Sequence, residues 1–387
     1  MEEGVKLVKT RRLRLAVAVV LLPLLAAACN GTAGSSSSNA GAQVAAKAVL
    51  PADQNAAPYV TKFSWGTFKL APRIIAKVKA HQPLNFVYSI SDAGQPVFSA
   101  AIKSGFQDGV AQAAKTFGYP LNARMIGPVG GGNQKQISEI QALLNSNQID
   151  VLVFNAAQPG PFIDVLNQVM AGGVPVWGTG GDSPQSHRIG FFALDEEVAG
   201  RQAGQLAAQW VKKHALPVTK AAVFTGDPAG PWAQSRMRGF IEGVHSELPS
   251  VQFVNGVSNP LNTGFDSPTV YADAKSFILG HSDVQLLFHT DQGVQMVGKA
   301  IADTARTGKT WAVGFNLSPE ILNYMKSSQI LVTEGQNWHG QAATAATAAA
   351  QFLFKGQVVQ GFKAATPYPV TPDTLTDAFK TLNSGGA

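Results

Sequence analysis

The stretch Val151-Leu152-Val153-Phe154-Asn155 decides the fold, because it places four consecutive apolar residues directly before a polar amide. A strand that is apolar at every position is buried on both faces, which is typical of a parallel sheet covered by helices. A second stretch of this kind, Leu286 to Phe288, lies far along the chain and is followed by Asp291. Two such stretches predict an α/β protein.

Outward from these stretches, short apolar runs alternate with longer segments of helical periodicity. The first series of predicted strands comprises 85–90, 121–126, 150–155, 174–179 and 188–194. The second series comprises 221–225, 251–254, 284–289, 311–315 and 330–334. Each series spans about the length of an ordinary domain, so the chain is expected to form two parallel-sheet domains.

The composition excludes several classes of protein. The chain has 387 residues, of which 45% are hydrophobic and 14% charged, so it is expected to be globular rather than disordered. Its formal charge is +6, but five basic and two acidic residues in positions 1–28 account for +3 of this. The remainder has no long basic run, and binding of nucleic acid is not expected.

The N-terminus reads as an export signal. Basic residues end at Arg14, an apolar run begins at Leu15, and three alanines precede Cys29, the only cysteine. This order resembles a bacterial lipoprotein signal at 1–28, although Ala26 stands where leucine is usual. Plain secretion, or an inert core cysteine, are the alternatives for Cys29. A lone cysteine also excludes an intrachain disulfide and a CxxC site.

Between this signal and the first strand lie two further segments. Residues 29–58 are rich in Gly, Ser, Asn and Ala, which predicts a flexible tether. Residues 59–83 carry scattered apolar positions, and this N-terminal extension is expected to pack along the folded body. The exported body is expected to be anchored through lipidated Cys29 to the outer face of the cell membrane, or else to be periplasmic.

Polar and aromatic side chains gather after the predicted strands. Ligands of parallel sheets bind at the carboxyl ends of the strands, so these residues are candidates for a binding site. Aromatic rings pack against the C–H faces of sugars, and planar polar groups hold adjacent hydroxyls. The candidates at these exits are Phe98, Asn155, Asp182, Trp232, Arg236, Phe265, Asp291, Asn316 and Gln336.

From about Leu84 to Lys363 the chain resembles the type 1 periplasmic binding proteins, in particular the ribose-binding-like branch that serves sugar ABC importers. The motifs that carry the resemblance are Gly105-Phe106, Leu194-Asp195-Glu196-Glu197-Val198-Ala199-Gly200, Arg236-Met237-Arg238-Gly239-Phe240 and Val313-Gly314-Phe315-Asn316. The resemblance implies two Rossmann-like lobes joined by a three-crossover hinge, with crossings near Leu194, Gln336 and Thr366. The first lobe would comprise 84–194 and 337–365, and the second 195–336 and 366–387.

The resemblance also implies roles for individual residues. The stacking aromatics of the family fall on Phe98 and Phe265, and its hydroxyl-binding residues fall on Asn155, Arg236, Asp291, Asn316 and Gln336. The Asp-Arg pair of the family aligns with Gly180 and Gly181, which leaves Asp182 displaced. Trp177 and Trp232 are expected to fill the space. Asn316 stands where aspartate is usual, and these departures argue against ribose as the ligand.

The implied function is capture of a small sugar or polyol, without a cofactor or metal, and delivery to an ABC permease by a monomer. A sensory receptor of the same fold is the alternative, and a carbohydrate-active enzyme is a third hypothesis. No GxSxG elbow or HExxH motif supports catalysis. The glycine-rich segment 127–133 lacks the Gly-Lys pair of a phosphate loop, and His289 is expected to be a packed core histidine.

Overall fold

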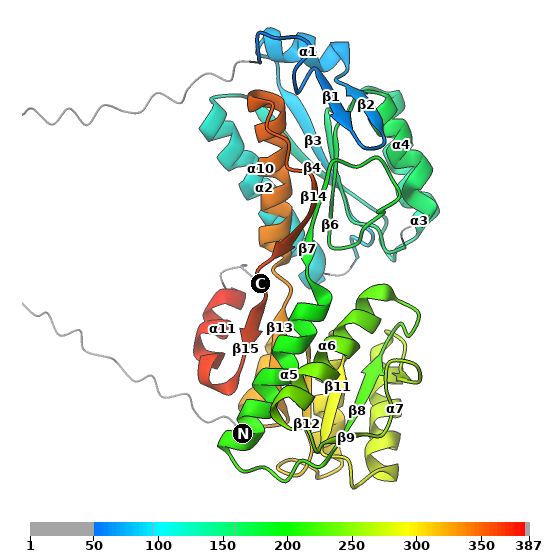
Figure 1. Ribbon diagram of the computed structural model, residues 1–387, viewed down its shortest axis with the longest axis vertical. Coiled ribbons are helices and arrows are strands. Elements are labelled where there is room, and N and C mark those ends of the chain that lie inside the picture. Colours follow the sequence, from blue (N-terminus) through cyan, green and yellow to red (C-terminus); the bar gives the residue numbers. More distant parts are fainter. Residues whose placement is uncertain (1–49, 95, 159, 384–387) are drawn as a thin grey trace, which may run out of the picture. The chain divides into compact units, whose positions relative to one another are not determined.

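The computed structural model describes residues 50–94, 96–158 and 160–383. Figure 1 shows two α/β lobes, each built around its own sheet. The signal, Cys29 and most of the predicted tether lie outside the described residues. No helix in the described part of the chain is both long enough and apolar enough to cross a membrane.

The sheet of the first lobe has six strands in the order β14-β7-β6-β5-β3-β4, and all of its pairings are parallel. Its strands are β3 (Leu84–Ser89), β4 (Leu121–Ile126), β5 (Val151–Phe154), β6 (Val176–Thr179), β7 (Gly190–Leu194) and β14 (Gly361–Ala365). Its helices are α2 (Pro96–Phe117), α3 (Asn133–Asn145), α4 (Ile163–Ala171) and α10 (Trp338–Lys355). In Figure 1, α2 and α10 cover one face and α3 and α4 the other.

The sheet of the second lobe follows the order β10-β8-β11-β12-β13-β15, and β9 also pairs with β8. Its strands are β8 (Lys220–Thr225), β9 (Gln252–Phe253), β10 (Leu261–Asn262), β11 (Leu286–His289), β12 (Trp311–Phe315), β13 (Ile330–Gly335) and β15 (Tyr368–Val370). Its helices are α5 (Glu196–Lys213), α6 (Pro231–Glu247), α7 (Ser267–Gly280), α8 (Val294–Asp303), α9 (Pro319–Lys326) and α11 (Leu375–Asn383). Helices α5 and α6 pack on one face, and α7, α8, α9 and α11 on the other.

The α/β class predicted from the sequence is confirmed, with two differences in detail. Strand β15 runs antiparallel to β13, so the second sheet is not wholly parallel. The predicted strand 251–254 is reduced to the two residues of β9, which pair with the start of β8. The chain then turns away and pairs with the end of β8 as β10.

The chain passes between the two sheets at three places. It leaves β7 and enters α5 at Leu194–Asp195, and it returns from β13 into α10 at Gln336–Asn337. The third passage links β14, which pairs with β7, to β15, which pairs with β13. Asp195 caps α5 through its bond from the Val198 amide, and this favours a helix start directly at the crossing.

Glycines let two pairs of helices approach within backbone contact. A β-carbon added at Gly239 of α6 would lie 2.0 Å from the Glu197 carbonyl oxygen of α5. One added at Gly105 of α2 would lie 2.1 Å from the His339 carbonyl oxygen of α10. Any larger side chain at these positions would push the helices apart, so each pair is locked at close range.

The N-terminal extension joins the core of the first lobe. It forms a hairpin of β1 (Val60–Phe63) and β2 (Gly66–Lys69), followed by α1 (Pro72–Lys79). The fully buried Asp150 carboxylate binds Arg73 and Lys77 of α1, and Lys77 lies 2.7 Å away. Leu50 and Ala57, inside the predicted tether, also pack against this core, so the folded body begins before residue 59.

Candidate functional site

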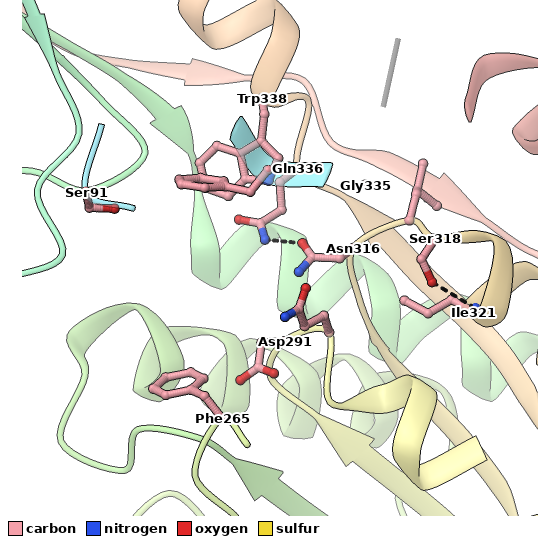
Figure 2. A pocket seen from close by; sticks show the side chains of 12 residues that line it. Ser91, Phe265, Asp291, Asn316, Ser318, Ile321, Gly335, Gln336 and Trp338 are labelled. Atoms are coloured by element: carbon pink, nitrogen blue, oxygen red, sulfur yellow. Dashed lines mark hydrogen bonds between the residues drawn. The ribbon is translucent and has the colours of Figure 1, made fainter. Parts of the chain in front are cut away.

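Two adjoining cavities of about 350 and 390 Å³ lie between the carboxyl ends of the strands of both sheets. We call them together the central pocket, and Figure 2 shows part of its lining. Eight of the nine residues predicted from the sequence line it, namely Phe98, Asn155, Trp232, Arg236, Phe265, Asp291, Asn316 and Gln336. The strand ends bring these residues together, as expected for parallel sheets.

The ninth residue, Asp182, lies elsewhere. Its carboxylate binds the guanidinium of Arg188 with both oxygens, and it lines a neighbouring cavity instead of the central pocket. Trp177 also does not fill the pocket, since it is fully buried in the core against Phe352. The expectation for Trp177 is therefore wrong, whereas Trp232 lines the pocket.

Arg236 organises the polar side of the pocket in the second lobe. The residue is 3% exposed, and its guanidinium donates to Glu196, to the Thr290 carbonyl oxygen at 2.7 Å and to Gln336 Oε1 at 2.7 Å. Gln336 in turn donates through Nε2 to Asn316 Oδ1. These bonds fix the arginine early in α6, where the helix dipole alone would disfavour a cation.

Asn316 itself has a left-handed backbone, with φ of 76°. Asparagine tolerates this conformation better than most residues. Its backbone N–H donates to the Glu334 carbonyl oxygen at 2.8 Å, and its carbonyl oxygen accepts from the Thr333 hydroxyl at 2.6 Å. The strands β12 and β13 thus hold the amide side chain beside Gln336 at the pocket wall.

Asp291 offers the pocket an unpartnered acceptor. Its Oδ1 accepts from the Gly293 amide at 2.8 Å, whereas its buried Oδ2 has no hydrogen-bond partner among the described residues. Figure 2 shows this carboxylate beside Phe265. Buried polar atoms are almost always hydrogen-bonded, so an unpaired carboxylate oxygen in a cavity indicates a position for a ligand donor.

His289 lies behind Asp291 in the core. Its ring is fully buried, it contacts the Thr263 hydroxyl at 3.0 Å through Nε2, and burial lowers its pKa. The backbone amide of Asp291 donates to Nδ1 at 3.3 Å, as a neutral imidazole allows. His289 Nδ1 also lies 3.3 Å from Asp291 Oδ1, so the ring supports the strand end that carries Asp291.

The side of the pocket in the first lobe is built around Asn155. Its Oδ1 accepts from the Ser91 hydroxyl at 2.7 Å, and its Nδ2 donates to the Thr179 carbonyl oxygen at 3.1 Å. Gln136 donates to its main-chain oxygen at 2.9 Å. Two bonds thus hold the side-chain amide in one orientation, and the Gln136 bond holds the backbone that carries it, which pre-organises Asn155 at the pocket wall.

Aromatic rings contribute surface from both lobes. Phe98 meets Trp338 edge to face, with ring centroids 5.0 Å apart, and Phe265 stacks on Trp232 with centroids 6.4 Å apart and ring planes inclined by 29°. Phe265 is 61% exposed, although large apolar side chains are usually covered. Rings that stand open beside amides and a carboxylate can pack on the C–H face of a polyhydroxylated ligand.

The sequence analysis missed Trp338. A β-carbon at Gly180 would lie 2.5 Å from its indole, and Gly180 also has a φ of +61°. The indole therefore occupies space that a side chain at position 180 would take. The glycines at positions 180 and 181, where the family has an Asp-Arg pair, indicated that another side chain fills this space. Only the fold shows that this side chain is Trp338.

The crossings between parallel sheets and the pocket at their strand ends define a two-lobed binding protein. The chain belongs to the periplasmic binding protein family, since a family model described as a periplasmic binding protein domain matches residues 74–357. The resemblance inferred from the sequence is thus confirmed. A search of curated proteins found no match.

Solved structures agree with this fold. A glucose-galactose binding protein from Geobacillus stearothermophilus matches with a TM-score of 0.62 and 20% identity over 76% of this chain and 98% of that one. An arabinose binding protein from the same organism gives 0.64 and 17% over 76% and 99%. The Caulobacter myo-inositol binding protein gives 0.62 and 18% over 77% and 96%.

Proposed function

We propose that this protein is an extracytoplasmic receptor that captures a small sugar or polyol in the central pocket and delivers it to an ABC importer. The unpaired Oδ2 of Asp291, set beside the open ring of Phe265, is the observation that carries the proposal. The structural neighbours described as binding glucose and galactose, arabinose or myo-inositol support the same ligand class. No chemical step on the ligand is needed.

The charge of the pocket disfavours an anionic ligand and is compatible with a polyhydroxylated one. Arg236 is already neutralised by Glu196, whereas Asp291 faces a neutral histidine. An anionic ligand would meet the carboxylate of Asp291 without a compensating cation, which is unfavourable in a partly buried site. Hydroxyl groups, by contrast, can donate to Asp291 and both donate to and accept from the amides of the wall.

The direct test is a thermal-shift screen with glucose, galactose, arabinose, fucose and myo-inositol. A ligand that binds only the folded state raises the melting temperature by mass action. Asp291→Ala should weaken the best binder by about 1.5–3 kcal/mol, because it removes a charged hydrogen-bond acceptor. Asp164→Asn, an exposed aspartate of α4, is the control and should bind as wild type. Equal affinity of Asp291→Ala and wild type would refute the assignment of the pocket.

We further propose that Cys29 is lipidated after cleavage of residues 1–28 and tethers a monomeric receptor to the membrane. The support is the sequence order of basic, apolar and small residues before Cys29. Cells fed an alkyne-tagged fatty acid should label the wild-type protein. Cys29→Ala should abolish the label and release the protein into the soluble fraction, and an unlabelled wild-type protein would contradict the proposal.

A further inference from the structure

A third cavity, of about 710 Å³, adjoins the central pocket. We call it the side chamber. It shares with the central pocket the segment Gly180–Gly181 and the residues Glu196, Asp227 and Trp232, so the two are continuous. Cavities of roughly 300–1,000 Å³ can each enclose a drug-sized ligand. A monosaccharide in the central pocket would leave the side chamber empty.

The lining of the side chamber suits an uncharged sugar ring. Phe362 of β14 is 47% exposed and lies 5.9 Å from Phe191 of β7, while Trp232 lines the same cavity. Carboxylates also line it, but it has no lysine, arginine or histidine in its lining among the described residues. Anionic ligands are therefore disfavoured, and the hydroxyl groups of a sugar can donate to these carboxylates.

The side chamber is also placed where closure would preserve it. Its wall includes Leu194 and Asp195, which form the first crossing, and Phe362 lies on the strand that leads to the third. A rotation about the crossings moves atoms less the closer they lie to its axis. The side chamber should therefore stay open when the lobes approach, so a bound group could remain there.

We infer that the ligand is an uncharged disaccharide, with one ring in the central pocket and the second over Phe362 and Trp232 in the side chamber. This inference rests on the proposed function and adds the size and charge of the ligand to it. Gly180, Gly181 and Trp232 line both cavities, so a ligand that spans the two would pass along this shared wall.

Isothermal titration of the full chain tests the inference. The probes are maltose, cellobiose, lactose and sucrose, their constituent monosaccharides, and a disaccharide that contains glucuronic acid. We expect one neutral disaccharide to bind at least tenfold more tightly than either of its monosaccharides, and the anionic disaccharide to bind weakly or not at all. A monosaccharide that binds as tightly as every disaccharide that contains it would overturn the inference alone, and absence of any sugar binding would overturn the proposed function with it.

Two variants locate the second ring. Phe362→Ala should lower the affinity for the disaccharide at least fivefold and leave the affinity for the monosaccharide unchanged. Ala229 is exposed and, among these cavities, lines only the side chamber. Ala229→Trp should narrow the side chamber and likewise lower the affinity for the disaccharide but not for the monosaccharide. Leu279→Ala, which truncates a 65% exposed leucine of α7, is the matched control. Unchanged disaccharide binding in both chamber variants would refute the second ring position.

Discussion

Glu334 is a buried acid next to the polar network of the pocket. Its side chain is fully buried, and neither carboxyl oxygen has a hydrogen-bond partner among the described residues. Burial raises its pKa well above the ordinary value of 4.5, and the nearby charge of Arg236 offsets this only in part. The group is therefore protonated in the folded protein at pH values where the unfolded chain has lost the proton.

This gives stability a defined pH dependence. Below pH 4.5, Glu334 is protonated in both states and contributes nothing to the difference. As the pH rises toward the folded pKa, the unfolded state is favoured by about 1.4 kcal/mol per pH unit. Glu334→Gln should thus match wild type near pH 4 and be more stable at pH 7, as measured by urea denaturation. The exposed Glu320→Gln is the control, and a pH-independent difference for Glu334→Gln would contradict the account.

Among the predicted site residues, the sequence pattern alone accounts for the positions of some but not of Asp182. Asp291, Asn316 and Gln336 each follow a strand that contains an apolar run, so their position at a sheet edge follows from the strand pattern. Asp182 follows a strand too, but Arg188, only six positions later, binds its carboxylate. Whether Asp182 binds Arg188 or faces the central pocket depends on the path of the loop between them, and no periodic sequence pattern predicts that path.

At the scale of elements, the strands that were predicted are those buried on both faces. The missed strand β14 is almost wholly exposed, and β15 contains a proline, so neither has an apolar pattern. The hairpin of β1 and β2 was also not predicted as strands, because its four-residue strands hold few buried positions. Trp338 was missed because its contact with Phe98 joins elements far apart in the sequence.

The locked helix pairs determine how the elements can move. Helix α5 follows the first crossing and is in backbone contact with α6. Helix α10 follows the second crossing and is in backbone contact with α2. Close packing of this kind transmits strain from one helix to its neighbour, which favours movement of each pair as a unit. We therefore expect each lobe to move as a rigid body, with the change of backbone angles confined to the three crossings.

At the scale of the whole molecule, ligand binding should shift the population toward a closed form, because only that form lets both lobes contact the ligand. Small-angle X-ray scattering should record a smaller radius of gyration when the best binding sugar is added at saturating concentration. Asp291→Ala, at the same sugar concentration, should shift less because its affinity is lower. No change in the wild-type protein would exclude closure on binding.

The position of Trp338 has a consequence for observing capture. Its indole lies at the pocket wall, immediately after a crossing and against Gly180. When water leaves an indole's surroundings, its fluorescence moves to shorter wavelength. The unmodified chain therefore carries a built-in optical reporter, and the speed of capture could be followed by stopped-flow emission without attaching a dye.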